Sequence, residues 1–301
     1  MSVLAITGGT GFVGGTLVNL ARSEGHQVRA LTRRPQPEHD RVTWIEGALD
    51  SAEALAELVA GADAVIHVAG VVNAPDRAGF AAGNIEGTRA IVAAAEQAGV
   101  RRFVHVSSLA AREPQLSVYG WSKAEAERVV EESSLDWAMV RPPAIYGPGD
   151  MEMRDLFRLA RFRLALTPPA GRLSVIEVSD LGRLLLAMAQ ADTGRQLLEA
   201  DDGRPGGWSH AEFAGLVGAA VGKRVRPIAL PRWLLSLAAR GDRLIRGKRA
   251  KLTLDRVAYF CHPDWVIDDA RRVDRALWQP EIPTVRGLVA TAAWYRAHSL
   301  L

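Results

Sequence analysis

The sequence predicts an α/β fold in which a doubly wound parallel sheet is followed by a smaller, mostly helical C-terminal region. Two observations lead to this prediction. Up to Arg141, short runs of β-branched apolar residues alternate with segments of helical periodicity, which is typical of a parallel sheet covered on both faces. Gly25, Gly61 and Gly99 stand just beyond three of the expected helices, where left-handed glycine caps commonly end a helix.

The expected elements follow in order along this first part of the chain. Strands are expected where short apolar runs lie between turn residues, at 3–7, 28–32, 42–46, 64–68, 102–107 and 137–141. Helices are expected between them, at 11–24, 51–60, 84–98 and 119–132.

The alternation ends after Arg141, where prolines and a glycine interrupt it. We therefore place a first domain at 1–145 and a substrate-binding region at 146–301, of which about 173–200 returns to the main sheet. The elements expected in this region are strands at 173–178 and 196–200 and helices at 180–190 and 284–298. Ser209 and Glu212 form a capping box, which predicts another helix that runs to about residue 221.

Composition narrows the possible classes of protein. With 301 residues, 48% of them hydrophobic, the chain can bury a sizeable core and is not disordered. A net charge of +3 gives no reason to expect nucleic acid as a partner. Cys261 is the only cysteine, which excludes an intramolecular disulfide and a cysteine metal cluster, so we expect no metal site. No uninterrupted apolar run approaches about 18 residues, and we expect a cytoplasmic protein.

A glycine-rich segment directly follows the first expected strand. It carries glycines at 8, 11 and 14 and leads into the first expected helix. Such a loop lets backbone amides approach a pyrophosphate at the positive end of a helix, as in Rossmann dinucleotide-binding domains. The bare motif is weak, but its position between strand and helix strengthens it. The residues expected to contact the cofactor here are Gly8, Thr10, Gly11, Phe12, Val13 and Gly14.

The end of the second expected strand indicates which dinucleotide binds. Binders of NAD usually carry an acidic residue there, whereas this chain has Thr32, Arg33 and Arg34. An acidic side chain would repel a 2′-phosphate, and guanidinium groups bind one in a bidentate manner. The sequence therefore favours NADPH. NAD remains the alternative, because arginine is common throughout this chain.

Tyr119 and Lys123 lie four residues apart and hence on one face of an expected helix. Only four of the 37 basic residues are lysines, so a lysine at this position is informative. A compact ammonium can contact a ribose hydroxyl and lower the pKa of a phenol, which a planar guanidinium does poorly. A pair that only packs on the helix face is the alternative. Ser107 and Ser108, at the end of the fifth expected strand, are candidates for holding a substrate oxygen.

Together these motifs resemble those of the extended or atypical short-chain dehydrogenases/reductases, the NAD-dependent epimerase/dehydratase group. The family's active-site motif matches at Tyr119 and Lys123, and its serine matches at Ser108. The segment 84–88 resembles the Asn-x-x-Gly-Thr helix start of the family, and 141–148 resembles its Arg-Pro…Tyr-Gly-Pro segment. The resemblance extends over nearly the whole chain.

The resemblance implies a mechanism. Lys123 would orient the nicotinamide ribose and lower the pKa of Tyr119, which would donate a proton to a carbonyl oxygen held by Ser108 as hydride arrives from the cofactor. In the reverse direction Tyr119 would be the base. The cofactor contacts implied outside the glycine loop and the two arginines are Leu49, Ala69, Asn84, Tyr119, Lys123 and Pro142. The interval from Ser108 to Tyr119 is shorter than in sugar epimerases, which weakens a nucleotide-sugar interpretation.

The C-terminal region bears on the substrate. Residues 232–251 carry seven basic residues and one acid, and their pattern predicts an amphipathic helix. Such a helix can rest on an anionic bilayer, or it can pack on the core as an ordinary surface helix. The tail resembles that of steroid-dehydrogenase-like members and of members like the complex I 39 kDa subunit. Bacterial members of this type include reductases proposed to act on 3-oxo-ceramide.

Three hypotheses for function follow. The first is reduction of a ketone on a lipid or steroid-like small molecule by NADPH, with peripheral membrane contact through 232–251. The second is an NAD-dependent nucleotide-sugar epimerase or dehydratase. The third is a non-catalytic NADPH-binding subunit, against which Tyr119 and Lys123 argue. A homodimer is the usual arrangement in the family and is left open.

Overall fold

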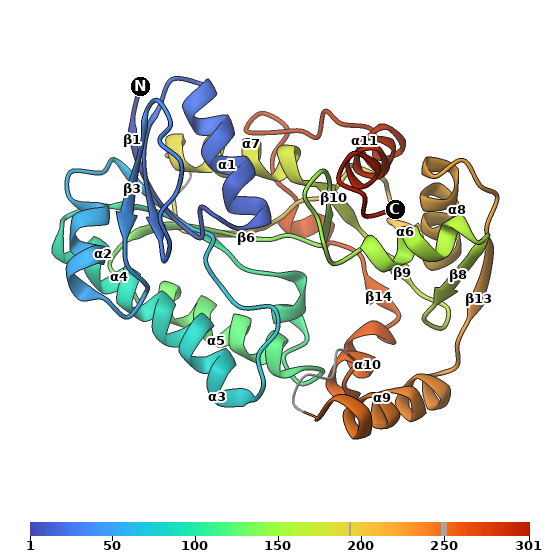
Figure 1. Cartoon of the computed structure of the whole chain (residues 1–301). Coiled ribbons are helices and arrows are strands. Elements are labelled where there is room, and N and C mark those ends of the chain that lie inside the picture. The colour runs from blue at the N-terminus through green and yellow to red at the C-terminus, as the bar shows by residue number, and fades with distance from the viewer. Residues whose placement is uncertain (193, 248–251) are drawn as a thin grey trace. The chain divides into compact units, whose positions relative to one another are not determined.

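A computed structural model describes residues 1–192, 194–247 and 252–301 (Figure 1). The chain divides into two compact units that each contain segments distant in sequence. The first unit comprises Met1–Pro142, Ser179–Glu199 and Arg271–Gln279. The second unit comprises Pro143–Val178, Ala200–Ala270 and Pro280–Leu301.

The first unit is built on a seven-stranded sheet whose neighbouring strands all run parallel, in the order β11-β6-β5-β4-β1-β2-β3. The strands are β1 (Val3–Thr7), β2 (Gln27–Thr32), β3 (Val42–Glu46), β4 (Ala64–His67), β5 (Arg102–Val106), β6 (Asp136–Arg141) and β11 (Gln196–Glu199). The predicted Rossmann-type α/β fold is confirmed. Six of these strands match the expected ones to within a residue at each end, and β11 pairs with β6 as an edge strand.

Helices cover both faces of this sheet (Figure 1). They are α1 (Phe12–Ser23), α2 (Ala52–Val59), α3 (Arg77–Phe80), α4 (Gly87–Gln97), α5 (Val118–Glu131) and α7 (Val178–Gln190). On one face α2, α4 and α5 bury the apolar side of the sheet around Val65, Phe103 and Met139. On the other face α7 approaches α1 so closely that a Cβ on Gly182 would lie 2.6 Å from the Leu20 side chain.

The expected glycine caps are confirmed. Gly25, Gly61 and Gly99 have φ of +87°, +65° and +72°, which glycine adopts without steric cost. The helix expected at 84–98 differs in one respect, because it begins with a π-helical segment, η1 (Ala81–Glu86), ahead of α4. A π-helical turn accommodates one extra residue per turn and often marks a functional site.

The second unit contains three small sheets and several helices. Its strands are β7 (Ala144–Tyr146), β8 (Leu164–Thr167), β9 (Arg172–Leu173), β10 (Val175–Glu177), β12 (Trp208–Ser209), β13 (Arg226–Ala229) and β14 (Asp264–Trp265). Its helices are α6 (Arg154–Arg161), α8 (His210–Ala220), α9 (Arg232–Arg246), α10 (Leu254–Phe260) and α11 (Thr284–Ala297). Short helical turns are η2 (Leu109–Arg112) in the first unit and η4 (Asp269–Arg271), within which the chain passes in sequence from the second unit to the first.

Two expectations for this unit can be compared with the structure. The strand expected at 173–178 is wrong as a single element, because the buried Ser174 hydroxyl bonds Asp201 at 2.7 Å and separates β9 from β10. The capping box is confirmed, since Ser209 and Glu212 bond each other's backbone amides at the start of α8. The core of the unit gathers around Tyr146, Phe157 and Tyr295. Among the described residues, no helix is long and apolar enough to cross a membrane.

Candidate active site

The loop between β1 and α1 has the geometry of an anion cradle. Gly8 has φ of +75°, and a Cβ there would lie 2.7 Å from the Ala69 amide nitrogen. A Cβ on Gly14 would lie 2.0 Å from the carbonyl oxygen of Gly8, so only glycine allows this close approach. Thr10 and Gly11 are exposed at the helix start, next to the partly buried Phe12 and Val13. Backbone amides at this end of α1 are therefore accessible to a pyrophosphate, and the loop fits a dinucleotide.

Arg33 and Arg34 follow β2, at the same carboxyl edge of the sheet as the glycine loop. Both side chains are exposed, and neither guanidinium is part of an ion pair among the described residues. The Thr32 hydroxyl bonds both the amide and the carbonyl oxygen of Arg34, which fixes the turn that carries the two arginines. Leu49, after β3, is partly buried and packs closely on Gly87 at the start of α4, where a Cβ would lie 2.6 Å from its side chain.

A row of buried polar groups links β1 to the helix side of the sheet. The His67 ring bonds the Thr7 hydroxyl at 2.6 Å and the Thr88 hydroxyl at 3.0 Å, and Thr7 also bonds the amide of Ala69. Burial and, to a smaller extent, Lys123 lower the pKa of His67 to about 3. The ring of His105 stacks on that of His67 at 5.3 Å. Both imidazoles are therefore neutral near neutral pH.

Asn84 lies in the π-helical segment and holds three elements together. Its Oδ1 accepts from the amide of Val71 at 2.7 Å, and its Nδ2 donates to the Val71 carbonyl and to the Ser122 hydroxyl. Gly70, in the backbone after β4, lies close to both Asn84 and Lys123. A Cβ at this position would be 3.0 Å from Asn84 Oδ1 and 3.8 Å from Lys123 Nζ. The structure therefore brings Asn84 and Lys123 to the same stretch of backbone after β4.

The predicted trio of Ser108, Tyr119 and Lys123 converges above the carboxyl end of β5. Ser108 caps η2, and its side chain lies close enough to the Tyr119 phenol to act to lower the pKa of that group. One turn further along α5, Lys123 is buried and its Nζ donates to the carbonyl of Val106 at 2.7 Å. A serine, a phenol and an ammonium thus meet at the edge of the sheet that also carries the glycine loop.

Burial sets the electrostatics of this trio. It raises the pKa of Tyr119, and the nearby Ser108 side chain opposes this rise. Burial lowers the pKa of Lys123 to about 8, although the Glu127 carboxylate acts to raise it. At neutral pH the phenol is therefore protonated and the amine is largely charged.

Sequence reasoning missed Glu127, which lies one turn beyond Lys123 on α5. Its carboxylate accepts hydrogen bonds from Nε and a terminal nitrogen of Arg141, at 2.8 and 2.6 Å. It also accepts one from the Ser107 hydroxyl at 2.5 Å. The Ser107 hydroxyl is therefore part of the Glu127–Arg141 network, whereas the Ser108 hydroxyl accepts from the amide of Ala110. Pro142, a predicted cofactor contact, is buried, and its carbonyl accepts from the amide of Leu109. The position of Glu127 four residues after Lys123 was the signal that could have found it.

Comparisons with known proteins agree with this geometry. The family described as NAD(P)H-binding matches residues 8–154. Over 98% of the chain and 95% of the relative, the sequence is 35% identical to a ceramide reductase of Caulobacter vibrioides. The chain belongs to the short-chain dehydrogenase/reductase family.

A second sequence relative is also a reductase, and a solved structure has the same fold. A 4-hydroxy-2-methyl-3-oxo-4-farnesyl-3,4-dihydroquinoline-1-oxide ketoreductase of Stigmatella aurantiaca is 30% identical over 66% of the chain and 68% of the relative. The structure of MoeE5 in complex with UDP-glucose and NAD has a TM-score of 0.73 at 24% identity, with coverage of 99% of this chain and 100% of that one. The protein is thus an NAD(P)-dependent oxidoreductase that acts on a small molecule.

Proposed function

We propose that this protein is an NADPH-dependent reductase that converts a ketone on an apolar, lipid-like substrate to an alcohol. The observation that carries the proposal is the placement of Ser108 and Tyr119 together beside the buried Lys123. The similarity to a ceramide reductase along nearly the whole chain supports a long-chain lipid, of which 3-oxo-ceramide is the specific candidate.

Each member of the trio has one role in this proposal. Ser108 donates a hydrogen bond to the ketone oxygen, and Tyr119, protonated at neutral pH, gives that oxygen its proton. The Lys123 ammonium, held by the Val106 carbonyl, binds a ribose hydroxyl and stabilises the negative charge left on the phenol. When bound, the reduced nicotinamide supplies the hydride. At neutral pH the phenol of Tyr119 is in its protonated form, which is the form that donates a proton in the direction of reduction.

The pKa of Lys123 predicts the pH dependence of reduction. The amine is charged below a pKa of about 8 and neutral above it, so kcat/KM should fall as pH rises through about 8. Tyr119 has a raised pKa and loses its proton only at higher pH. The check is a profile of kcat/KM in the wild type and in Lys123→Arg, whose guanidinium keeps its charge throughout. The variant should be slower and should lack the fall near pH 8; if the fall persists, another group causes it.

The choice of NADPH over NADH is expected to depend on Arg33 and Arg34. A double Arg33→Gln/Arg34→Gln variant should bind NADPH about 10 to 100 times more weakly, because charge-assisted bonds to a phosphate are worth about 1.5–3 kcal/mol. Affinity for NADH should change less than about twofold. Arg101→Gln is the matched control, since this exposed arginine lies at the opposite, amino edge of the sheet. Equal affinity of the wild type for NADPH and NADH would refute the preference.

The proposed reaction is tested directly with purified protein, NADPH and 3-oxo-ceramide in detergent micelles. Loss of NADPH should accompany a product that mass spectrometry finds heavier by two hydrogens. A short, polar 3-oxo amide is the control substrate, and equal rates on both would contradict the preference for an apolar substrate. The nucleotide released on denaturation is the second readout. Tightly retained NAD would favour the nucleotide-sugar hypothesis instead.

A further inference from the structure

The outward face of α9 is apolar, which is the reverse of what a surface helix normally presents. Trp233, Leu237 and Leu244 are 67%, 57% and 88% exposed, and Ile245 is 85% exposed. The first three lie within about 40° of one another around the helix axis, since each residue turns an α-helix by about 100°. Ala239, on another side of the helix, is the residue of α9 that is buried. Helix α9 therefore does not bury its apolar stripe as an ordinary surface helix does.

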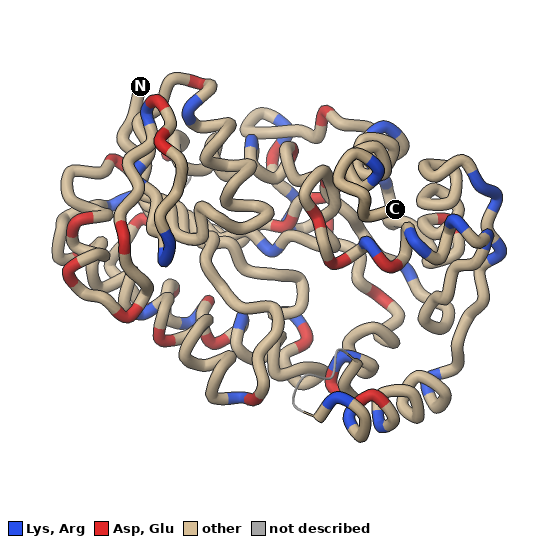
Figure 2. The backbone as a smooth tube through the Cα atoms, viewed as in Figure 1, with Lys and Arg blue, Asp and Glu red and all other residues tan. Residues whose placement is uncertain are grey.

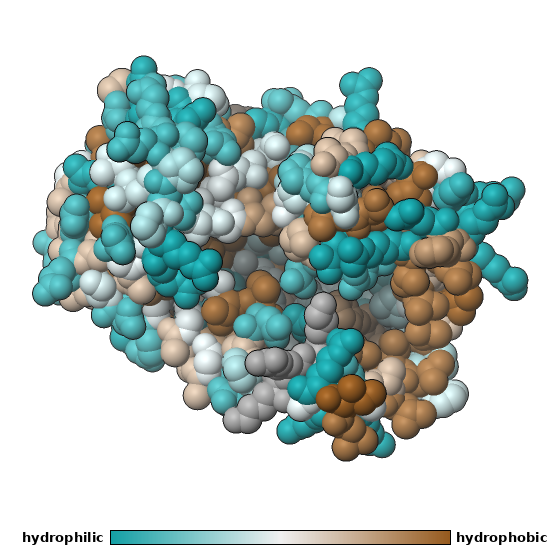
Figure 3. All heavy atoms as spheres, viewed as in Figure 1, coloured by the Kyte–Doolittle hydropathy of each residue, from teal (hydrophilic) through white to brown (hydrophobic). Residues whose placement is uncertain are grey.

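Two apolar residues of α10, the helix that packs against α9, extend this surface. Leu254 and Phe260 are 52% and 44% exposed. Figure 3 shows hydrophobic atoms gathered over α9, at the lower right of the view. We call the six side chains at Trp233, Leu237, Leu244, Ile245, Leu254 and Phe260 the α9–α10 surface.

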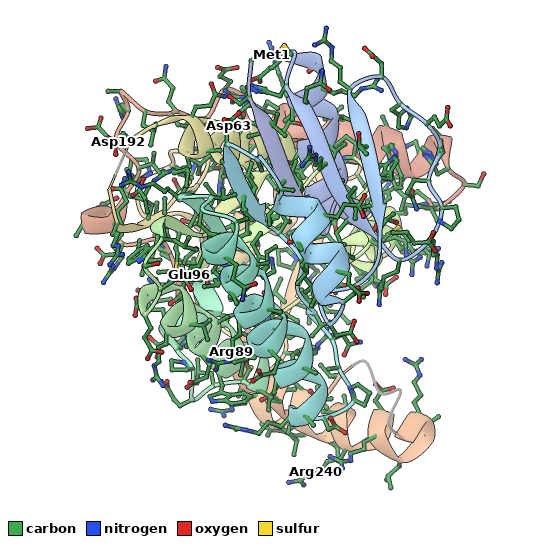
Figure 4. All side chains as sticks on the ribbon, turned by 90° about the vertical axis from the view of Figure 1, so that its left-hand side faces the viewer. Met1, Asp63, Arg89, Glu96, Asp192 and Arg240 are labelled. Atoms are coloured by element: carbon green, nitrogen blue, oxygen red, sulfur yellow. The ribbon has the colours of Figure 1, made fainter. Side chains whose placement is uncertain are left out.

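Positive charge borders this surface. Arg240 and Arg243 are exposed beside the apolar stripe, and Arg232 is exposed at the start of the helix. Figure 2 shows basic segments along α9, and Figure 4 shows the Arg240 side chain projecting from the helix. The acid of α9, Asp242, is half-buried, pairs with Arg246 at 3.3 Å and accepts from the amide of Leu252. Within the described ranges 1–192, 194–247 and 252–301, neither Arg240 nor Arg243 forms an ion pair. The basic residues at 248, 249 and 251, counted in the predicted amphipathic segment, lie outside the described residues.

We propose that the α9–α10 surface docks this protein on an anionic lipid bilayer. Exposed tryptophan, leucine and isoleucine side chains enter the interface between headgroups and acyl chains, and the arginines beside them pair with anionic headgroups. A second copy of the chain is a poorer occupant. In a two-fold dimer the same patch meets itself, so the arginines of both copies would face each other. The proposal concerns binding alone and does not depend on the reductase activity.

The test is cosedimentation of the full chain with vesicles of phosphatidylcholine alone and with about 30% phosphatidylglycerol. We expect binding to the anionic vesicles, little binding to the neutral ones, and weaker binding as salt is raised. Leu237→Ser/Leu244→Ser and Arg240→Gln/Arg243→Gln should each weaken binding by about tenfold or more, because each removes one of the two contributions.

Matched controls lie on other helices of the same unit. Val285→Ser/Val289→Ser removes two exposed apolar side chains of α11, and Arg161→Gln/Arg286→Gln removes two exposed arginines of α6 and α11. Both controls should bind like the wild type. Absence of binding to anionic vesicles, or equal loss in the controls, would overturn the proposal. Light scattering tests the second copy as occupant. If the wild type is a dimer and the α9 variants are monomers, the surface binds a second copy of the chain and the proposal is wrong.

Discussion

Replacement of Tyr119 by phenylalanine is expected to reduce kcat for ketone reduction by about 10²–10⁴-fold, the usual contribution of a positioned general acid. The change removes one oxygen, which lies near the Ser108 side chain, and it leaves the ring beside Phe80, with 6.2 Å between the ring centroids. The fold should therefore be unchanged. NADPH affinity should fall little, because the glycine loop and Lys123 remain in place.

The measurement is kcat with 3-oxo-ceramide beside an NADPH titration by fluorescence. Tyr259→Phe is the matched control, because it removes the same oxygen from a tyrosine of the second unit. Ser108→Ala should lower kcat less than Tyr119→Phe, and the double variant should be little worse than Tyr119→Phe alone, because the two groups act on one oxygen. Full activity of Tyr119→Phe would contradict the proposed mechanism and would favour a non-catalytic role for Tyr119.

Removal of Glu127 is expected to have the largest effect on stability. Glu127→Ala leaves the Arg141 guanidinium without its bidentate partner and the Ser107 hydroxyl without its acceptor, in a site where Glu127 is 4% exposed. Glu199 approaches Arg141 only at 3.7 Å and compensates in part. Breaking a buried ion pair from one side typically costs about 3–5 kcal/mol of unfolding free energy.

Urea unfolding followed by circular dichroism measures this cost. Glu125→Ala is the matched control on the same helix, because its ion pair with Arg128, at 2.7 Å, is largely exposed and should be worth about 0.5 kcal/mol or less. Glu127→Gln keeps the shape and one acceptor but loses the charge, so it should destabilise the fold less. It should also lower the pKa of Lys123 and move the fall in kcat/KM to lower pH, since Glu127 acts to raise that pKa. A Glu127→Ala variant no less stable than Glu125→Ala would contradict this account of the network.

Much of the first unit could be predicted because the signals for its strands and helices lie in neighbouring residues. Apolar runs and glycine caps located six strands and most helices, since a parallel strand buried on both faces must be apolar and a left-handed cap favours glycine. The elements that were misplaced depend on distant partners. The strand at 173–178 is divided because Ser174 bonds Asp201, and nothing near Ser174 in the sequence announces that bond.

The candidate site divides in the same way. Tyr119 and Lys123 were predicted from spacing, because a phenol and an amine four residues apart must share a helix face, and Ser108 was predicted from its place at the end of a strand and from the family resemblance. The pKa directions could not be found, since they depend on burial beneath η1, η2 and the sheet. The partnership of Glu127 with Arg141 joins α5 to β6, and only the packing of the helix on the sheet brings the two side chains together.

The sequence by itself determined the α/β class, the glycine loop and the residues of the trio, because periodicity, a backbone without side chains and helical spacing are properties of neighbouring residues. The tertiary structure alone decided which groups are charged, which serine bonds Glu127 and which way α9 turns its apolar stripe. Solvation and hydrogen-bond partners set these properties. Both are contributed by segments that lie far apart in the chain, as Ser107 and Glu127 illustrate.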